Sequence, residues 1–290
     1  MVQTAAKDEK YVHPEAIVDT QWVQDHLKDE KVRIAEVDYD PTANYELGHI
    51  PGAVLINWKA DINDPLTRNV LSKQAFEDLI QRIGVNKDDN NTLVLYGDFN
   101  NWFAAFAFWV FKYYGYHDVR IINGGRKKWL IEDRPISKDI PHYTKGDYKA
   151  AAKPDTNIRV FLDYVKATLG SKALIDVRSP KEFSGEITAP PEYPTEHAQR
   201  GGHIPKAVNI PWAQAVNDSD GTFKSVNELK NLYESKGITP DKEIITYCRI
   251  GERSSHTWFV LKYLLGYPNV KNYDGSWTEW GNMIANPIEK

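Results

Sequence analysis

The chain repeats its own sequence, and this internal duplication restricts the possible folds more than any other feature. The segment GHIPGAVLINW at 48–58 recurs as GHIPKAVNIPW at 202–212. A second, ungapped match aligns residues 93–130 with 244–281 and keeps glycine, tyrosine and tryptophan positions in register. Two matches in the same order indicate a duplicated domain. Two cores are also what a chain of 290 residues is expected to form.

Each copy alternates strand-like and helix-like segments. In the second copy, short β-branched segments predict strands at 173–177, 207–210, 243–247 and 269–273. Apolar residues at helical spacing predict helices at 226–237, at 252–266 and from 275 onward. Such alternation predicts a mostly parallel central sheet covered on both faces. We therefore expect an α/β protein of two tandem three-layer α/β/α domains.

The expected domain bounds are 1–135 for the first domain and 158–290 for the second. Residues 136–157, between them, are rich in charge and proline and lack apolar periodicity, so they are predicted to form the linker. Because duplicated domains usually share an interface, we expect this linker to pack on both domains.

Composition narrows the range of partners and compartments. A net charge of -4 gives no reason to expect nucleic acid as a partner. One cysteine permits neither an internal disulfide nor a multi-thiolate metal site, which favours a reducing compartment. The amino-terminal MVQTAAKDEK lacks the apolar core of a secretory signal, so a cytoplasmic location is predicted. The apolar run at 102–111 spans about 15 Å as a helix, too short for a bilayer of roughly 30 Å, and is read as a buried helix.

The single cysteine, Cys248, lies between a predicted strand and a predicted helix. Ligand sites in parallel sheets lie at this edge, and a helix amino terminus stabilises an anion such as a thiolate. Arg249 and Arg253 add positive charge, and Gly251 permits the positive φ of a tight loop. We expect these neighbours to lower the pKa of the thiol from about 8.5 to about 6.5.

The first copy lacks this chemistry at the matched positions. Gly97 replaces Cys248, Asp98 replaces Arg249 and Trp102 replaces Arg253. Catalysis is therefore expected in the second domain only. A cysteine phosphatase is a possible alternative, but its loop needs arginine at the sixth position after the cysteine, which here is Ser254. The shorter loop suits one added sulfur atom better than a phosphate.

The duplicated halves, the motif DVRSPKEF at 176–183, the loop CRIGER at 248–253 and YDGSWTEW at 273–280 resemble the tandem-domain rhodaneses. These are thiosulfate sulfurtransferases, and the loop is similar to that of the bacterial, actinobacterial-type members. The resemblance implies an inactive first domain and a catalytic second domain whose cysteine carries sulfane sulfur as a persulfide.

Carried to this sequence, the resemblance implies that Cys248 attacks the outer sulfur of thiosulfate and releases sulfite. Cyanide, or a biological thiol that includes a protein thiol, then takes the sulfur. No metal or organic cofactor and no membrane are expected to take part. The residues expected to bind the donor are Arg249, Ile250, Gly251, Glu252, Arg253, Ser254 and Trp277.

The sequence alone does not decide the roles of several other residues near the cysteine loop. Asp176 and Arg178 either brace the cysteine loop or form a surface ion pair, and Trp277 either lines the pocket or belongs to the core. The negative charge of Glu252 would repel an anionic donor unless an arginine neutralises it. The expected partner is Arg200 or Arg178. Alternative functions are 3-mercaptopyruvate sulfurtransfer and a non-catalytic sulfur carrier or scaffold.

Overall fold

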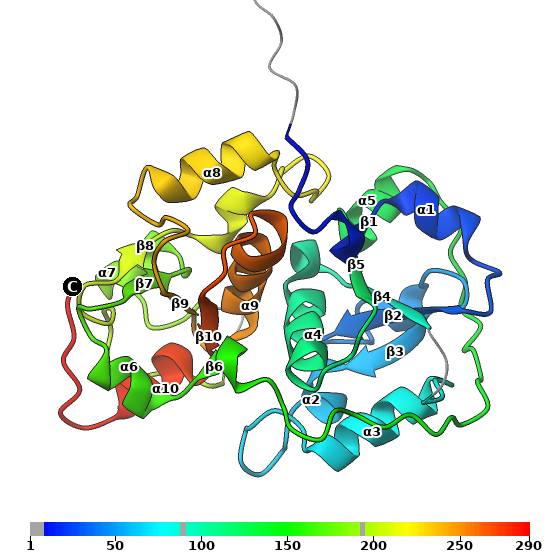
Figure 1. Ribbon diagram of the computed structural model, residues 1–290, viewed down its shortest axis with the longest axis horizontal. Coiled ribbons are helices and arrows are strands. Elements are labelled where there is room, and N and C mark those ends of the chain that lie inside the picture. Colours follow the sequence, from blue (N-terminus) through cyan, green and yellow to red (C-terminus); the bar gives the residue numbers. More distant parts are fainter. Residues whose placement is uncertain (1–8, 88–90, 192–194) are drawn as a thin grey trace, which may run out of the picture. The chain divides into compact units, whose positions relative to one another are not determined.

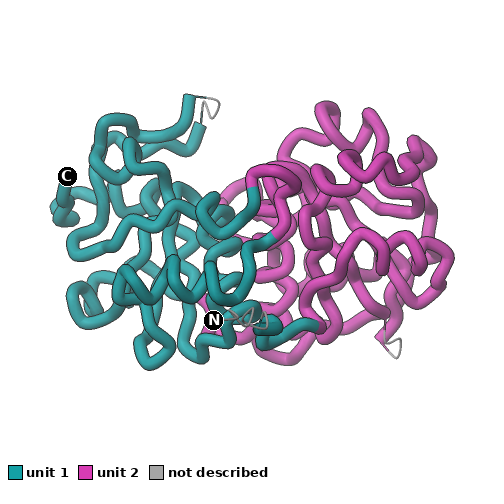
Figure 2. Tube along the Cα trace, turned by 90° about the horizontal axis from the view of Figure 1, so that it is seen from above, with its two compact units in different colours: residues 1–14, 160–217, 223–290 teal, residues 15–159, 218–222 magenta. Residues whose placement is uncertain are grey.

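The computed structural model describes residues 9–87, 91–191 and 195–290 of the chain. Its contacts divide the chain into two compact units (Figure 2). The cysteine unit contains 160–217, 223–290 and the described part of 1–14, and the cysteine-free unit contains 15–159 and 218–222. The predicted linker, 136–157, thus belongs wholly to the cysteine-free unit, where Ser137 and His49 exchange two backbone hydrogen bonds of 2.8 Å.

The first sheet has five parallel strands in the order β1-β5-β4-β2-β3 (Figure 1). Its elements are β1 (Ile17–Val18), α1 (Thr20–Asp25), β2 (Val32–Asp38), β3 (Val54–Asn57), α2 (Trp58–Asp61), α3 (Lys73–Arg82), β4 (Thr92–Tyr96), α4 (Trp102–Tyr113), β5 (Val119–Ile122) and α5 (Gly125–Ile131). Short 3-10 turns lie at Pro14–Ala16, Tyr45–Leu47 and Phe99–Asn101.

The second sheet repeats this topology as β6-β10-β9-β7-β8, again with all strands parallel. Its elements are β6 (Arg159–Val160), α6 (Leu162–Ala167), β7 (Ala173–Asp176), α7 (Pro180–Ser184), β8 (Val208–Asn209), α8 (Val226–Glu234), β9 (Ile244–Tyr247), α9 (Glu252–Phe259), β10 (Val270–Tyr273) and α10 (Ser276–Asn282). Short 3-10 turns lie at Thr156–Ile158 and Trp212–Ala215. The predicted duplication and fold class are confirmed.

Residues on both faces of the strands are buried, because helices cover both sides of the sheet. In β4, Val94 and Tyr96 share a core with the α1 and α5 side of the sheet, including Trp129. Leu93 and Leu95 alternate with them and are also fully buried. Figure 1 shows α1 and α5 on one face of this sheet and α2 and α3 on the other. The apolar α4 is buried as predicted.

The helix predicted at 252–266 changes geometry partway along. Residues Glu252–Phe259 are α-helical, and Val260–Leu264 form a π-helix that ends at Leu265. Two short helices begin with capping boxes, Ser179 with Glu182 in α7 and Ser225 with Glu228 in α8. The sequence analysis did not predict α7, although Ser179, Pro180 and Glu182 form a typical helix start.

Candidate active site

Cys248 follows β9 directly and lies four residues before Glu252, the first residue of α9. The turn between them depends on Gly251, whose φ is +99° and whose position leaves no room for a side chain. A Cβ there would lie 2.7 Å from Cα of Asp274, which follows β10. The strand end, the glycine and the helix start therefore fold the loop tightly around the thiol.

Backbone N–H groups of the loop converge on the sulfur. Gly251 N–H donates to Cys248 Sγ at 3.1 Å, and N–H groups of Ser254 and Ile250 also favour the charged thiolate. Ser254 Oγ donates to Asn272 Oδ1 at 2.6 Å, which joins the first turn of α9 to β10. The predicted loop residues thus form one buried cradle whose side chains and backbone hold its shape.

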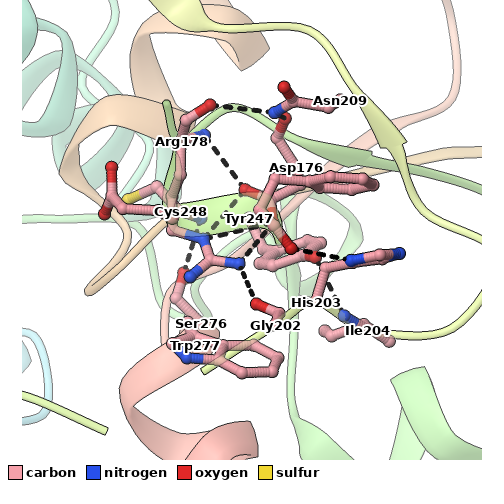
Figure 3. Close-up of polar contacts among 12 residues, drawn as sticks. Asp176, Arg178, Gly202, His203, Ile204, Asn209, Tyr247, Cys248, Ser276 and Trp277 are labelled. Atoms are coloured by element: carbon pink, nitrogen blue, oxygen red, sulfur yellow. Dashed lines mark hydrogen bonds and ion pairs between the residues drawn. The ribbon is translucent and has the colours of Figure 1, made fainter. Parts of the chain in front are cut away.

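The start of α10 fixes the other side of the cysteine. Cys248 N–H donates to Ser276 Oγ at 3.0 Å, and Trp277 N–H donates to Cys248 C=O at 3.0 Å (Figure 3). Thr278 N–H donates to Arg249 C=O at 3.0 Å. Sequence reasoning missed Ser276, although its place in the DGSW motif is a signal that could have pointed to it.

The two arginines of the loop have different partners. Arg253 forms a bidentate ion pair with Glu182 of α7, at 2.9 Å for each Nη–Oε contact. Burial alone would raise the pKa of Glu182, but Arg253 lowers it to about 2. Arg249 Nη1 donates to Thr195 C=O at 3.0 Å. Both guanidinium groups are buried, at 2% and 5% exposure for Arg249 and Arg253.

Glu252 does not pair with Arg200 or Arg178, so that expectation is wrong. Arg200 donates to carbonyl oxygens, among them that of Gly281 at 2.9 Å. The carboxylate of Glu252 instead lies 3.8 Å from Arg249 Nη2 and 3.9 Å from Arg253 Nε. Its Oε2 accepts the hydrogen of Cys248 Sγ at 3.4 Å. The Glu252 side chain reaches the thiol because the residue lies in the first turn of α9, four residues after the cysteine.

The thiol pKa is raised, contrary to the sequence-based prediction. Cys248 is fully buried, and burial is the largest cause of the shift, followed by the charge of Glu252. Arg253 and the loop N–H groups lower the thiol pKa, but by less than burial and Glu252 raise it. The prediction counted cations near the thiol but had no means of seeing that Glu182 pairs with Arg253.

Asp176 and Arg178 form a fully buried pair at the end of β7, not a surface ion pair (Figure 3). Arg178 Nη2 also donates to Gly202 C=O at 2.7 Å, and its guanidinium lies 4.6 Å from the ring of Trp277. The ring of Trp277 is itself fully buried in the core, the second of its two predicted roles. Arg178 thus contacts Trp277, whose backbone N–H donates to Cys248 C=O, and the bracing role stays a prediction.

The family of the chain follows from comparison with known proteins. The family model described as rhodanese-like domain matches twice, at residues 19–132 and 161–283. The chain belongs to the rhodanese family. It is 56% identical to the sulfur carrier protein TtuD of Thermus thermophilus, over 97% of this chain and 98% of TtuD.

Further rhodanese relatives and structures agree with this assignment. The chain is 52% identical to a Saccharopolyspora erythraea protein named "Putative thiosulfate sulfurtransferase", over 95% of this chain and 96% of the relative. Among solved structures, an EanB variant with a cysteine persulfide and ergothioneine aligns with a TM-score of 0.86. That alignment has 27% identity and covers 97% of this chain and 72% of the EanB chain. Family and names together support a sulfurtransferase.

The first rhodanese domain has a reversed charge at the matched loop. Asp98 occupies the position of Arg249 and accepts from Asn44 Nδ2 at 2.6 Å, and burial raises its pKa to about 6. Gly97 N–H, at the position of the thiol, donates to Asn101 Oδ1 at 3.1 Å. The first loop thus keeps its fold without the groups needed to hold an anion.

Metal-ligand clusters and membrane-spanning helices are both absent from the described part of the rhodanese chain. No group of three or more His, Cys, Asp or Glu side chains within it has an arrangement that holds a metal ion. Among its helices, none combines the length and apolar character needed to cross a bilayer.

The buried His256 of α9 packs against the rings of Trp212 and Phe223, and burial lowers its pKa to about 3.

Proposed function

We propose that this rhodanese transfers sulfane sulfur from thiosulfate to a thiophilic acceptor, with Cys248 as the carrier of the sulfur. The observation that carries the proposal is the six-residue loop, in which Gly251 N–H points at Cys248 Sγ and Arg249 and Arg253 flank the first turn of α9. Such a cradle stabilises a compact anion of the size of one added sulfur.

The proposed cycle has two steps. The thiolate of Cys248 attacks the outer sulfur of thiosulfate, a new S–S bond forms, and the old S–S bond breaks with its electron pair leaving on sulfite. The terminal sulfur of the persulfide then lies among the N–H groups of Ile250, Gly251 and Ser254. Cyanide attacks that terminal sulfur, leaves as thiocyanate and regenerates the thiolate. The cycle needs no metal and no organic cofactor.

Arg249 and Arg253 are proposed to attract the sulfonate end of the donor. Arg253 is held in a bidentate pair with Glu182, and Arg249 lies 3.8 Å from Glu252, so the attraction is proposed to act through the positive charges of both side chains beside the loop. A dianion such as thiosulfate gains more from two cations than the monoanion 3-mercaptopyruvate. The names of the Saccharopolyspora relative and its mycobacterial counterparts agree with this donor.

Steady-state kinetics with both donors and cyanide test the proposal. We expect parallel double-reciprocal lines, as for a covalent intermediate, and a kcat/KM for thiosulfate at least about tenfold above that for 3-mercaptopyruvate. Cys248→Ser should abolish both activities. Arg249→Gln should raise the KM for thiosulfate more than that for 3-mercaptopyruvate. A preference for 3-mercaptopyruvate, or turnover of an aryl phosphate alone, would contradict the proposal.

The name of the Thermus relative favours a second candidate, a sulfur carrier that passes its sulfur to a protein thiol. Loading with thiosulfate followed by chase with cyanide or with a thiol-bearing protein separates the two. A carrier loads Cys248 but discharges faster to the protein thiol than to cyanide. An enzyme of the thiosulfate:cyanide type turns over rapidly with cyanide.

A further inference from the structure

The carboxylate of Glu252 contacts the reacting sulfur itself. Its Oε2 accepts the thiol hydrogen of Cys248 at 3.4 Å, within the range of a hydrogen bond from sulfur. Glu252 is 1% exposed and Cys248 is fully buried, so water does not compete readily for this proton. The contact joins an acid and a base directly at the position where sulfur transfer would take place.

The nearby cations have other hydrogen-bond partners than this carboxylate. Arg253 is already committed to Glu182 through two contacts of 2.9 Å, and Arg249 donates to Thr195 C=O. The two guanidinium groups lie 3.8 and 3.9 Å from the Glu252 carboxylate. They are close enough to offset its negative charge but too far away to donate hydrogen bonds to it. Glu182 is thus held in a bidentate pair, whereas Glu252 is not.

Formal charge among the loop side chains and Glu182 balances when the Cys248 and Glu252 pair holds one proton. Asp274, which is buried and packs against Gly251, adds a further negative charge outside this set. Arg249 and Arg253 are matched by Glu182 and Glu252 while the thiol is neutral. Loss of that proton to solvent would leave an uncompensated buried negative charge, which is costly. Transfer of the proton from Cys248 to Glu252 keeps the balance. The neighbouring Asp176–Arg178 pair is neutral as a unit and does not alter it.

We propose that Glu252 is a catalytic residue that shuttles one proton to and from Cys248 during sulfur transfer, an inference that rests on the proposed function. In the first step the Sγ proton moves to Glu252 Oε2 as Cys248 attacks thiosulfate, and sulfite leaves. The products are an anionic persulfide and a neutral carboxylic acid. In the second step cyanide takes the terminal sulfur, and the acid returns its proton to Sγ as thiocyanate leaves.

This arrangement reconciles a raised thiol pKa with a nucleophilic role. A permanently ionised thiolate would face the negative charge of Glu252 in a buried site. With the shuttle, the thiolate and the persulfide exist only while Glu252 is neutral, so the repulsion is absent when the anion must be held. The thiolate of Cys248 is a poor leaving group because its pKa is raised. By protonating Sγ, the acid also assists the release of Cys248 when cyanide takes the terminal sulfur.

The first domain provides an internal contrast at the same helix start. Asn101 occupies the position of Glu252, and its Oδ1 accepts from Gly97 N–H at 3.1 Å. An amide at this position holds the loop but neither accepts nor returns a proton at neutral pH. The titratable group at this position therefore occurs only in the domain that has the thiol.

Infrared difference spectroscopy between the thiol and persulfide forms of the full chain tests the shuttle. Loading with thiosulfate should remove the S–H stretch and add the C=O stretch of a protonated carboxyl group. In Glu252→Gln the carboxyl band should be absent. Glu186→Gln, at an exposed ion pair with Lys181, should keep it and serves as the matched control.

The outcomes separate this proposal from the proposed function, with the mass of the protein measured in parallel. A persulfide that forms without the carboxyl band in wild type, or with the band retained in Glu252→Gln, overturns the shuttle while sulfur transfer stands. Failure of the wild type to gain sulfur overturns both. As a second readout, the pH midpoint of iodoacetamide alkylation should fall in Glu252→Gln, and an unchanged midpoint would show that the contact does not govern the thiol.

Discussion

At the residue scale, the thiol of Cys248 is a buried neutral group at rest rather than a standing thiolate. Burial and Glu252 together raise its pKa. Reactivity then depends on where its proton goes when the donor arrives. Residues that define the local charge, above all Glu252 and Glu182, therefore matter as much as the cysteine itself.

The pH dependence of alkylation tests this resting state. Because the pKa of Cys248 is raised, the thiolate fraction is small at neutral pH and grows as the pH rises. The rate of iodoacetamide alkylation of the wild type should keep rising through and beyond about pH 8.5, the midpoint of an ordinary cysteine. A midpoint near pH 6.5 would contradict the raised pKa and restore the sequence-based expectation.

A second residue-scale prediction concerns the buried pair of Glu182 and Arg253. Glu182→Gln leaves the guanidinium of Arg253 buried opposite a neutral amide, which should cost about 3–5 kcal/mol in the free energy of unfolding. Glu186→Gln removes an exposed partner of Lys181 and should cost about 0–1 kcal/mol. Urea unfolding measures both, and equal effects would contradict the structural role of the buried pair.

The sequence predicted the geometry of the cysteine loop better than its electrostatics. Cys248, Arg249, Gly251 and Arg253 come together as expected, because strand, turn and helix signals fix their order. The partners of Arg253 and Glu252 were not predictable, since they depend on the placement of α7 and α9 across the sheet. The long-range partner Ser276 was missed for the same reason.

At the element scale, the loop between β9 and α9 is held by backbone geometry. Gly251 adopts a φ of +99° directly against Asp274, and Ser276, at a φ of 53°, caps the cysteine N–H. The positions of β7, β8, β9 and β10 were predictable from short β-branched segments, whereas β6 was not predicted. The π-helical end of the helix after Cys248 was not, because its pattern of apolar residues also fits a continuous α-helix.

Replacing the loop glycine tests this geometry. Gly251→Ala should destabilise the protein by about 3 kcal/mol or more, since a Cβ adds backbone strain and a 2.7 Å approach to Asp274 Cα. Gly170→Ala is the matched control, because its φ is +77° with nothing within 4 Å of the added Cβ. Its cost should be about 1 kcal/mol. Thermal or urea unfolding that ranks the two variants in the reverse order would refute this account.

At the scale of the whole molecule, duplication predicted the fold but not the exact membership of each unit. The two sheets have the same strand order, as the repeat requires. Residues 218–222 nevertheless belong to the cysteine-free unit, and the described residues before Glu15 belong to the cysteine unit. Such exchanges of short segments leave no periodic signal, because they rest on a few polar contacts. Lys127 and Lys128 contact Asp218 and Asp220 in one case, and the amino-terminal segment forms backbone hydrogen bonds in the other.

Truncation of the amino terminus tests this membership. Val12 N–H and His13 N–H donate to the carbonyls of Leu264 and Tyr263, each at 3.0 Å. Deleting residues 1–14 should cost the cysteine unit at least about 2 kcal/mol, at about 1 kcal/mol for each of these two bonds, and speed hydrogen exchange in 260–264. The Tyr11 hydroxyl, which bonds to the carbonyls of Phe223 and Lys224, is lost as well. Deleting only residues 1–8 keeps these bonds and is the control. Equal exchange in both truncations would contradict the assignment.

Intact-protein mass spectrometry shows whether Cys248 carries sulfane sulfur. After treatment with thiosulfate, the wild-type chain should gain the mass of one sulfur atom and lose it again on addition of cyanide. Cys248→Ala should gain nothing under the same conditions. A wild-type chain that gains no sulfur, or a Cys248→Ala variant that gains it equally, would contradict the account.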